Sequence, residues 1–444
     1  MTLSGERKAF IVVDLGFGDA GKGLVTDYLV RRHGADLVAR FNGGAQAGHN
    51  VVTADGRHHT FSQFGSGSFV PGVKTHLCRD VVVHPTALGV EAQVLSAKGE
   101  PNVLQRLSVS PLCRVTTPFQ QAQGRLLELA RGAARHGSCG VGVGETVADS
   151  LAHPELTVCF RDLLSPNHDV LERLAAQREL KLSHWKQRAL SAEQHAEFAL
   201  LADAGVVERW LAAARAVALQ VALVDDADAL KGAGSVVFEG AQGVLLDEDF
   251  GFHPFTTYSH CTPHRARALL TESNFGGSTE CVGVVRTYAV RHGPGPLPTE
   301  SAEVARLTSE LHNLHGPWQG AVRKGYFDLA LLRYALAAAA SVDALCVTHL
   351  DALPLLDEHQ WCERYHDFEL RLPSNLSEQE ALTQELLAAR PHYAHVGPER
   401  RVTADAFCSQ LTAQTSVPVR YAASGRTAND VAQPNFTSPV CSTP

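Results

Sequence analysis

Two glycine-rich loops near the start of the chain hold the residues best suited to chemistry. The first loop reads GFGDAGKG over residues 16–23. It follows an apolar run at 11–15 and precedes an expected helix at 24–32. A strand, a glycine loop and a helix in this order point backbone N–H groups at a phosphate. The spacing G-x-x-x-x-G-K, with Lys22 as its cation, matches most of a P-loop.

The loop departs from that pattern at its last position. Gly23 stands where a serine or threonine would supply the hydroxyl that binds magnesium. Asp19 lies inside the same loop and is the candidate metal ligand in its place. A plain glycine turn between a strand and a helix is the alternative interpretation.

The second loop, FNGGAQAGHN at residues 41–50, follows another apolar strand at 37–39. It contains a single histidine, His49, with glycine before it. A lone histidine is more often structural than catalytic. Because His49 lies in a glycine loop at the same edge of the sheet as the first glycine loop, a catalytic role is favoured for it.

Composition restricts the class of protein that carries these loops. The chain has 444 residues, of which 45% are hydrophobic, enough for a large core in one α/β domain with insertions or in two domains. The net charge is −8 and the basic residues are scattered, so we expect no nucleic-acid or membrane partner. Ten cysteines without a C-x-x-C pair, and an N-terminus lacking an apolar signal segment, indicate reduced thiols and a cytoplasmic protein.

The elements that must position the loops follow from hydrophobic patterning. Five or more strands each end in a glycine loop, and residues 281–290 are expected to form one continuous strand ending at Arg291. Such loops gather at the carboxyl ends of strands in an open α/β sheet, where ligands bind. We therefore predict a large, mostly parallel central sheet with helices on both faces and P-loop-like nucleotide-binding architecture. A helical insertion is expected at about 165–230 and a smaller segment at about 354–415.

With its further motifs, the sequence resembles the adenylosuccinate synthetase family. The two loops look like that family's G-D-E-G-K-G and G-G-x-N-A-G-H-T motifs. The resemblance continues, in the family's order, through FEGAQGVLLD at 238–247, GPGPLPTE at 293–300, THLD at 348–351 and ASGRT at 423–427. It implies one domain over 1–444 that uses GTP to join IMP to L-aspartate, with Mg²⁺, as a cytoplasmic homodimer.

The resemblance also implies roles for individual residues. Asp19 would remove the N1 proton of a 6-oxopurine and, with the Gly48 carbonyl, coordinate magnesium. His49 would contact the transferring phosphoryl group, and the Gln242 amide would steady the reacting 6-oxygen. Residues implied in nucleotide binding are Gly18, Gly21, Lys22, Gly23, Asp351, Ser424 and Gly425. Asp351 would accept hydrogen bonds from N1–H and the 2-amino group of guanine.

The departures from the family lie where the substrates are expected. The implied substrate-binding residues are Gln46, Cys139, Thr257, Arg291 and Arg323. Gln46 replaces an asparagine and Cys139 a threonine that contact the IMP phosphate, and a family arginine is replaced by Val141. Of the arginines that grip aspartate only Arg323 remains.

A phosphate dianion needs several donors and at least one charge-assisted bond. The acceptor is therefore either IMP or a purine without that phosphate, and the amine either aspartate or another. An inactive nucleotide-binding regulator and an unrelated P-loop GTPase are the remaining alternatives.

Overall fold

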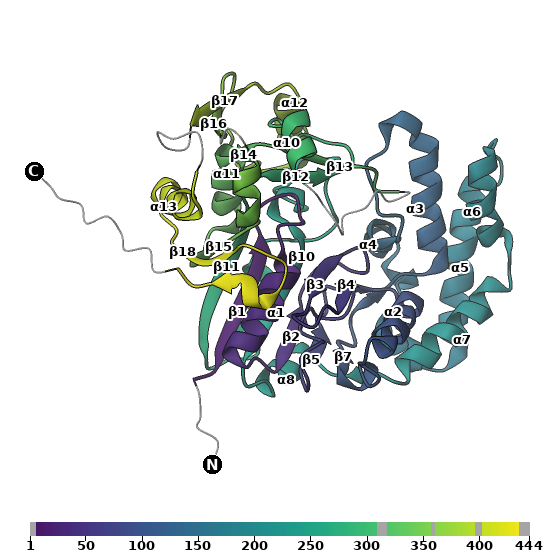
Figure 1. The fold of residues 1–444 in the computed structure, drawn as a ribbon. Helices are drawn as coiled ribbons and strands as arrows, with labels where there is room; N and C mark the ends of the chain where they lie inside the picture. The colour runs from purple at the N-terminus through teal and green to yellow at the C-terminus, as the bar shows by residue number, and fades with distance from the viewer. Residues whose placement is uncertain (1–5, 309–317, 357–359, 396–401, 435–444) are drawn as a thin grey trace, which may run out of the picture.

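A computed structural model describes residues 6–308, 318–356, 360–395 and 402–434 (Figure 1). Its centre is a ten-stranded sheet. The strands in spatial order are β19 (Val431–Ala432), β18 (Val419–Ala423), β15 (Ala344–Thr348), β11 (Ser278–Arg286), β1 (Lys8–Asp14), β10 (Val236–Gly243), β2 (Leu37–Arg40), β5 (Lys74–Leu77), β7 (Leu107–Val109) and β9 (Ala222–Leu223). Every neighbouring pair is parallel except β18 and β19. The predicted mostly parallel α/β fold is confirmed.

Strand β1 shows why the sheet must be covered on both faces. Successive side chains of a strand point to opposite faces. Phe10 and Val12 pack into one apolar cluster with α1 (Lys22–His33), whereas Ile11 and Val13 pack into another with α9 (His264–Glu272) and α11 (Leu329–Ala339). A strand that is apolar on both faces is typical of a parallel sheet between helical layers.

The other helices form two groups beside the sheet. One group gathers at the β7–β9 end of the sheet, on the right of Figure 1, around its own apolar cluster. It contains α2 (Pro85–Ala97), α3 (Pro118–Arg131), α4 (Val143–Ala152), α5 (Asn167–Trp185), α6 (Ala192–Ala202) and α7 (Val206–Ala218). The short α8 (Asp226–Lys231) leads into β10. The stretch 165–230 is thus mainly helical.

The second group lies beyond the opposite half of the sheet. It contains α10 (Ala302–Leu307), α12 (Leu376–Leu387) and α13 (Ala404–Thr415), with a small sheet of β14 (Phe327–Asp328), β16 (Gln360–Tyr365) and β17 (Pro391–His395). Three strand pairs stand apart: β3 (His49–Val52) with β4 (His58–Phe61), β6 (Val82–Val83) with β8 (Arg114–Val115), and β12 (Ala289–His292) with β13 (Val322–Gly325). Among the described residues, no helix has the length and apolar character that crossing a membrane requires.

The prediction of one strand over 281–290 is wrong. β11 ends at Arg286, and β12 starts at Ala289 in a separate antiparallel pair with β13. The chain turns at 287–288, where the Arg286 guanidinium bonds the Tyr288 hydroxyl and the Thr287 hydroxyl donates to the His349 carbonyl at 2.7 Å. This break carries Arg291 and His292 out of the sheet and over its carboxyl edge.

Candidate active site

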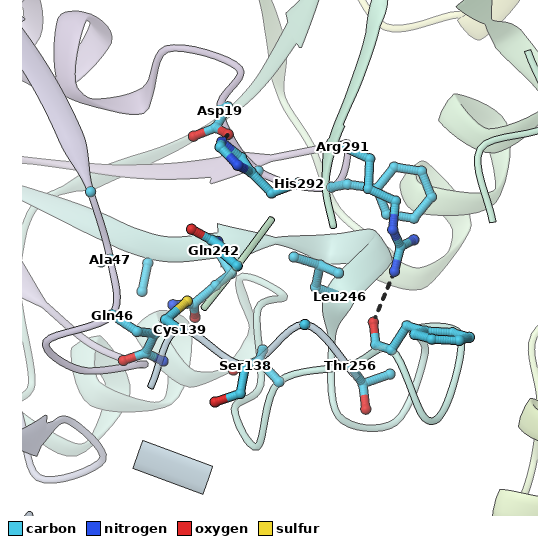
Figure 2. Close-up of a pocket in the computed structure, with 18 of the residues that line it drawn as sticks. Asp19, Gln46, Ala47, Ser138, Cys139, Gln242, Leu246, Thr256, Arg291 and His292 are labelled. Atoms are coloured by element: carbon cyan, nitrogen blue, oxygen red, sulfur yellow. Dashed lines mark hydrogen bonds and ion pairs between the residues drawn. The ribbon is translucent and has the colours of Figure 1, made fainter. Parts of the chain in front are cut away.

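The glycine loops predicted to share one edge of the sheet line a single cleft of about 1220 Å³. The loops after β1, β2, β10, β15 and β18 all contribute to its walls. They are joined by residues 136–145 before and within α4, by the 253–258 segment and by β12. Figure 2 shows part of this cleft, with Asp19 and His292 at one end and Gln46, Ser138 and Cys139 further away.

The first loop is held by a buried aspartate that sequence analysis missed. Asp14, the last residue of β1, accepts hydrogen bonds from the backbone of Gly16 at 2.8 Å and of Ala20 at 2.9 Å. Lys22 Nζ donates to the same carboxylate at 3.1 Å, and both side chains are buried. Asp14 therefore fixes both the shape of the loop and its cation. The signal in the sequence was an acidic residue closing an otherwise apolar strand.

Asp19 projects from the loop in a left-handed conformation, with φ of 60°. Its carboxylate is 2.9 Å from His292 Nε2, and Arg286 donates to its backbone carbonyl at 2.9 Å. Burial alone would raise the pKa of Asp19. The hydrogen bond and charge of His292, with the charges of Lys22 and Arg286, outweigh burial and lower that pKa. Asp19 is therefore ionised at neutral pH.

His49 forms a buried pair with Glu239, a residue of β10. His49 Nδ1 lies 2.6 Å from Glu239 Oε1, and His49 Nε2 lies 2.8 Å from the Ala241 carbonyl oxygen. Both partners are acceptors, so a neutral ring satisfies one of them and an imidazolium satisfies both. Burial, together with the charges of Arg40 and Lys22, outweighs the Glu239 carboxylate and lowers the pKa of His49, so burial and the hydrogen-bond geometry act in opposite directions.

The Glu239 carboxylate is itself held in place by hydrogen bonds and by neighbouring positive charge. Burial alone would raise its pKa, but His49, Arg40 and the hydrogen bond from Ser66 lower it to about 2. The Ser66 backbone N–H donates to the carboxylate at 3.0 Å, and the Ser66 hydroxyl also donates to it. The carboxylate therefore stays charged and orients the imidazole.

Two glutamine side chains in the cleft have unused hydrogen-bonding capacity. The oxygen and nitrogen of both the Gln242 and the Gln46 side chains are buried, and none of the four has a partner among the described residues. A Cβ on Gly43 would lie 2.9 Å from Gln242 Oε1, and one on Gly44 would lie 3.1 Å from Gln46 Oε1. Consecutive glycines thus leave room for both amides. Buried polar atoms without partners are rare, and these point to a ligand.

The predicted nucleotide-binding residues are mostly brought together. Gly18, Gly21, Lys22, Gly23, Asp351 and Gly425 line the cleft, together with Arg426. Ser424 is exposed and is not part of the lining. His349 also lines the cleft, and burial together with the charges of Arg286 and Lys324 places its pKa well below the usual value. Its ring is therefore neutral.

The predicted substrate-binding residues divide into two sets. Gln46, Cys139, Thr257 and Arg291 line the cleft, as does Gly48, whereas Arg323 does not. Arg323 Nε donates one N–H that is shared between the two carboxylate oxygens of Glu300, each at 3.0 Å, and Nη2 also donates to Glu300. Nη1 donates to the carbonyls of Gly293 and Gly295. Its guanidinium is committed to holding the 293–300 loop.

Arg291 is likewise committed to the protein, although it lines the cleft. It donates to the carbonyls of Pro294, Pro296 and Phe255, and its guanidinium lies 4.3 Å from the centre of the Phe17 ring. Burial, with the nearby charge of Arg323, lowers its pKa to about 9. Burial and the charge of Asp19 raise the pKa of the Cys139 thiol to about 12, so this side chain is neutral.

Known proteins resemble this chain both in sequence and in fold. The sequence model described as adenylosuccinate synthetase matches residues 11–431. Adenylosuccinate synthetase of Alkalilimnicola ehrlichii is 35% identical over 366 residues, which are 81% of this chain and 80% of that protein. The same enzyme of Clostridium beijerinckii is 33% identical over 364 residues, 80% of this chain and 81% of that one.

Two solved structures have the same fold. Fully ligated adenylosuccinate synthetase of Plasmodium falciparum superposes with a TM-score of 0.75 at 20% identity, over 97% of this chain and 100% of that chain. Succinoaminodeoxyadenylate synthetase of cyanophage S-2L, bound to dGMP and dATP, gives 0.58 at 18% identity, over 97% and 96%.

Proposed function

The chain belongs to the adenylosuccinate synthetase family of GTP-dependent ligases, which form a C–N bond in purine metabolism, and we propose how its own residues carry out that reaction. The alternative of an unrelated P-loop GTPase is therefore wrong. The observation that supports the proposal is the shared cleft: Asp19, His49 and Gln242 line it beside Lys22.

The first step is removal of the N1 proton from a 6-oxopurine. Asp19 is ionised and accepts that proton, so that negative charge develops on the 6-oxygen. The buried, unpartnered Gln242 amide donates to this oxygen. The amide does not have to move to form this hydrogen bond, because Gly43 leaves space for it. His292 holds the Asp19 carboxylate in position.

The second step transfers the γ-phosphoryl group. The 6-oxygen attacks the γ-phosphorus, the bond from that phosphorus to the bridging oxygen of GTP breaks, and GDP leaves. Backbone N–H groups of Gly18, Gly21 and Gly23, at the N-terminus of α1, face the phosphates, and Lys22 offsets the charge on the bridging oxygen. Asp14 keeps Lys22 in place throughout.

In the third step an amine attacks C6, loses its proton, and displaces inorganic phosphate. L-aspartate is the amine of the family. His49 Nε2 exchanges its contact with the Ala241 carbonyl for a phosphoryl oxygen and supplies an acid as phosphate departs, while Glu239 holds Nδ1. The His49–Glu239 pair thus acts on a phosphate leaving group as a carboxylate-oriented imidazole acts on the leaving group in acyl transfer.

Magnesium fits the donor set of the cleft. The Asp19 carboxylate uses one oxygen for His292, and its other oxygen and the Gly48 carbonyl are hard donors of the kind Mg²⁺ takes beside phosphates. When bound there, the ion neutralises phosphate charge. We further propose a cytoplasmic homodimer. The nine described cysteines are all free, which agrees with a reducing compartment.

The test is phosphate release from GTP by the full-length chain with Mg²⁺, a panel of 6-oxopurines and a panel of amines including L-aspartate. We expect release only when both an acceptor and an amine are present. Asp19→Asn should lower kcat by roughly 100-fold or more. The control Asp228→Asn, an exposed aspartate of α8, should not. Full activity of Asp19→Asn would refute the proposed base.

A further inference from the structure

The part of the cleft beyond Gln242 carries an unexpected distribution of charge. We define the acceptor arm as the cleft-lining residues Gln46, Ser138, Cys139, Glu145 and Thr257. Figure 2 shows Gln46, Ser138 and Cys139 on the far side of Gln242 from Asp19. A purine whose 6-oxygen lies at Gln242 and Asp19 must therefore extend its remaining substituents into this arm.

Close packing shows that the arm is one continuous surface. A Cβ on Gly44 would lie 3.1 Å from both Gln46 Oε1 and Val143 Cγ2, so Gln46 adjoins the start of α4. A Cβ on Gly144 would lie 3.5 Å from the Tyr258 ring, so the start of α4 adjoins the 253–258 segment. Loop 136–142 connects the same helix to α3.

Several backbone N–H groups of this loop already donate to side chains of the protein. Buried Glu128 accepts from the backbone N–H of Gly137 at 3.1 Å, and of His136 and Ser138 at 3.4 Å. Ser138 Oγ accepts from the N–H of Gly140 at 3.2 Å. These four N–H groups are therefore committed within the protein, and a carboxylate holds three of them.

The first turn of α4 also contains a carboxylate. Glu145 lies there, where negative charge interacts favourably with the helix dipole, and its side chain lies over Gly124. It also lines the cleft, and although burial raises the pKa of its carboxyl, once ionised it presents negative charge to any ligand in the acceptor arm.

The neighbouring cations do not offset these two carboxylates for a ligand. Arg131 bonds to Glu128, and Arg125 donates to the Gly140 carbonyl at 2.8 Å and to Glu197 at 3.1 Å. Arg131 itself lines the cleft, but its charge is paired with Glu128, and the other side chains of the acceptor arm are neutral hydroxyl, thiol and amide groups. A phosphate dianion would therefore meet two carboxylates against one arginine that is already paired.

The unpartnered amide of Gln46 indicates what the arm accepts instead. Its oxygen needs a donor and its nitrogen an acceptor, and both atoms are buried. A hydroxyl group offers both, whereas an ionised phosphate oxygen offers only an acceptor. A ligand with a free hydroxyl at this point satisfies Gln46 and avoids repulsion by Glu145.

We propose that the acceptor of this enzyme is a 6-oxopurine nucleoside with a free hydroxyl at its sugar end, not a nucleotide. The inference rests on the proposed function, because that function orients the purine in the cleft. The class of reaction that supplies the acceptor would then be one that releases a nucleoside from a nucleotide or joins a purine base to a sugar.

The test compares binding of inosine and IMP to the full-length chain, by calorimetry at pH 8 with Mg²⁺ and a non-hydrolysable GTP analogue. We expect inosine to bind at least about 30-fold more tightly than IMP, since a site built for a hydroxyl rejects its charged replacement strongly. Equal or tighter binding of IMP would overturn the inference. If neither compound binds and neither supports phosphate release from GTP, the proposed function fails as well.

Two variants and one control separate the effect of the Glu145 charge from that of the Gln46 amide. Glu145→Gln should tighten IMP binding by roughly tenfold and change inosine binding less than about threefold. Glu172→Gln, which removes an exposed carboxylate of α5 that pairs only with His168, should change neither. Gln46→Leu should weaken inosine binding by about tenfold and leave IMP binding unchanged. If Gln46→Leu weakens both ligands equally, Gln46 does not read the hydroxyl and the inference is wrong.

Discussion

The contact between Glu239 and His49 gives the sharpest prediction. Glu239→Gln keeps the size of the side chain and removes its charge. The pKa of this carboxyl falls from 4.5 to about 2 although burial opposes the change. One pKa unit corresponds to about 1.36 kcal/mol. Its interactions with His49, Arg40 and Ser66 therefore exceed the cost of burial by about 3 kcal/mol.

That figure predicts how stability depends on pH. The pKa is lower in the folded state than in the unfolded state, so the stabilisation is complete above about pH 4.5 and lost as the pH falls through about 2. We expect Glu239→Gln to lose up to about 3 kcal/mol of unfolding free energy at pH 7, but only about 1 kcal/mol near pH 3. Urea titration of both proteins at the two pH values measures the difference.

The same substitution should disable catalysis at a distinct step. Without the carboxylate, the imidazolium is no longer stabilised and His49 less often carries the proton that it must donate, so kcat should fall by roughly 100-fold while the KM for GTP changes less than about threefold. His49→Ala and the double variant should have nearly the same kcat as Glu239→Gln, because residues that act as a unit are not additive. Additive losses, or a kcat within threefold of the parent protein, would refute the dyad.

Three further perturbations test other parts of the cleft. Gly43→Ala places a Cβ 2.3 Å from that of Ala241 and 2.9 Å from Gln242 Oε1, so kcat should fall by about 100-fold. Gly56→Ala is its control, because Gly56 also has positive φ but no atom within 4 Å of the added Cβ. Asp14→Asn should destabilise the protein by about 2 kcal/mol in thermal unfolding and raise the KM for GTP at least tenfold, since Lys22 loses its buried partner. Asp351→Asn should weaken GTP binding by roughly 30-fold but leave ATP binding unchanged, and calorimetry with the two nucleotides would show equal losses if Asp351 does not contact guanine.

The local elements of the cleft could be read from the sequence. The strand, glycine loop and helix over residues 11–32 were predicted, because apolar runs and glycines act within a few residues. The mostly parallel sheet followed from repetition of the same unit, and the structure confirms it. The break between β11 and β12 was missed because residues 281–290 are apolar on both sides of the turn.

Contacts between residues on strands that are distant in the sequence could not be predicted in this way. β10 follows β2 by about two hundred residues but lies between β1 and β2, with Glu239 paired to Val12 on one side and Arg40 on the other. Only that strand order brings Glu239 to His49. Arg323 was misleading for a related reason: residue type and spacing do not show that Glu300 already holds its guanidinium. The position of Asp14 at the end of a strand is evident from the sequence, but its role depends on how the loop folds back over it.

The architecture separates the reacting groups from the groups that choose the acceptor. Asp19, Glu239 and Gln242 stand on β10 and the loop after β1, in the central sheet, and His49, at the start of β3, is held to that sheet by Glu239. The acceptor arm is built mainly from the α3–α4 loop and the 253–258 segment, where Glu128 and Glu145 decide the charge that a ligand meets. Substitutions in the arm can therefore change the acceptor without disturbing the paired charges that activate the 6-oxygen. Membership of the family therefore does not by itself fix the acceptor, and the nucleoside and nucleotide must be compared directly.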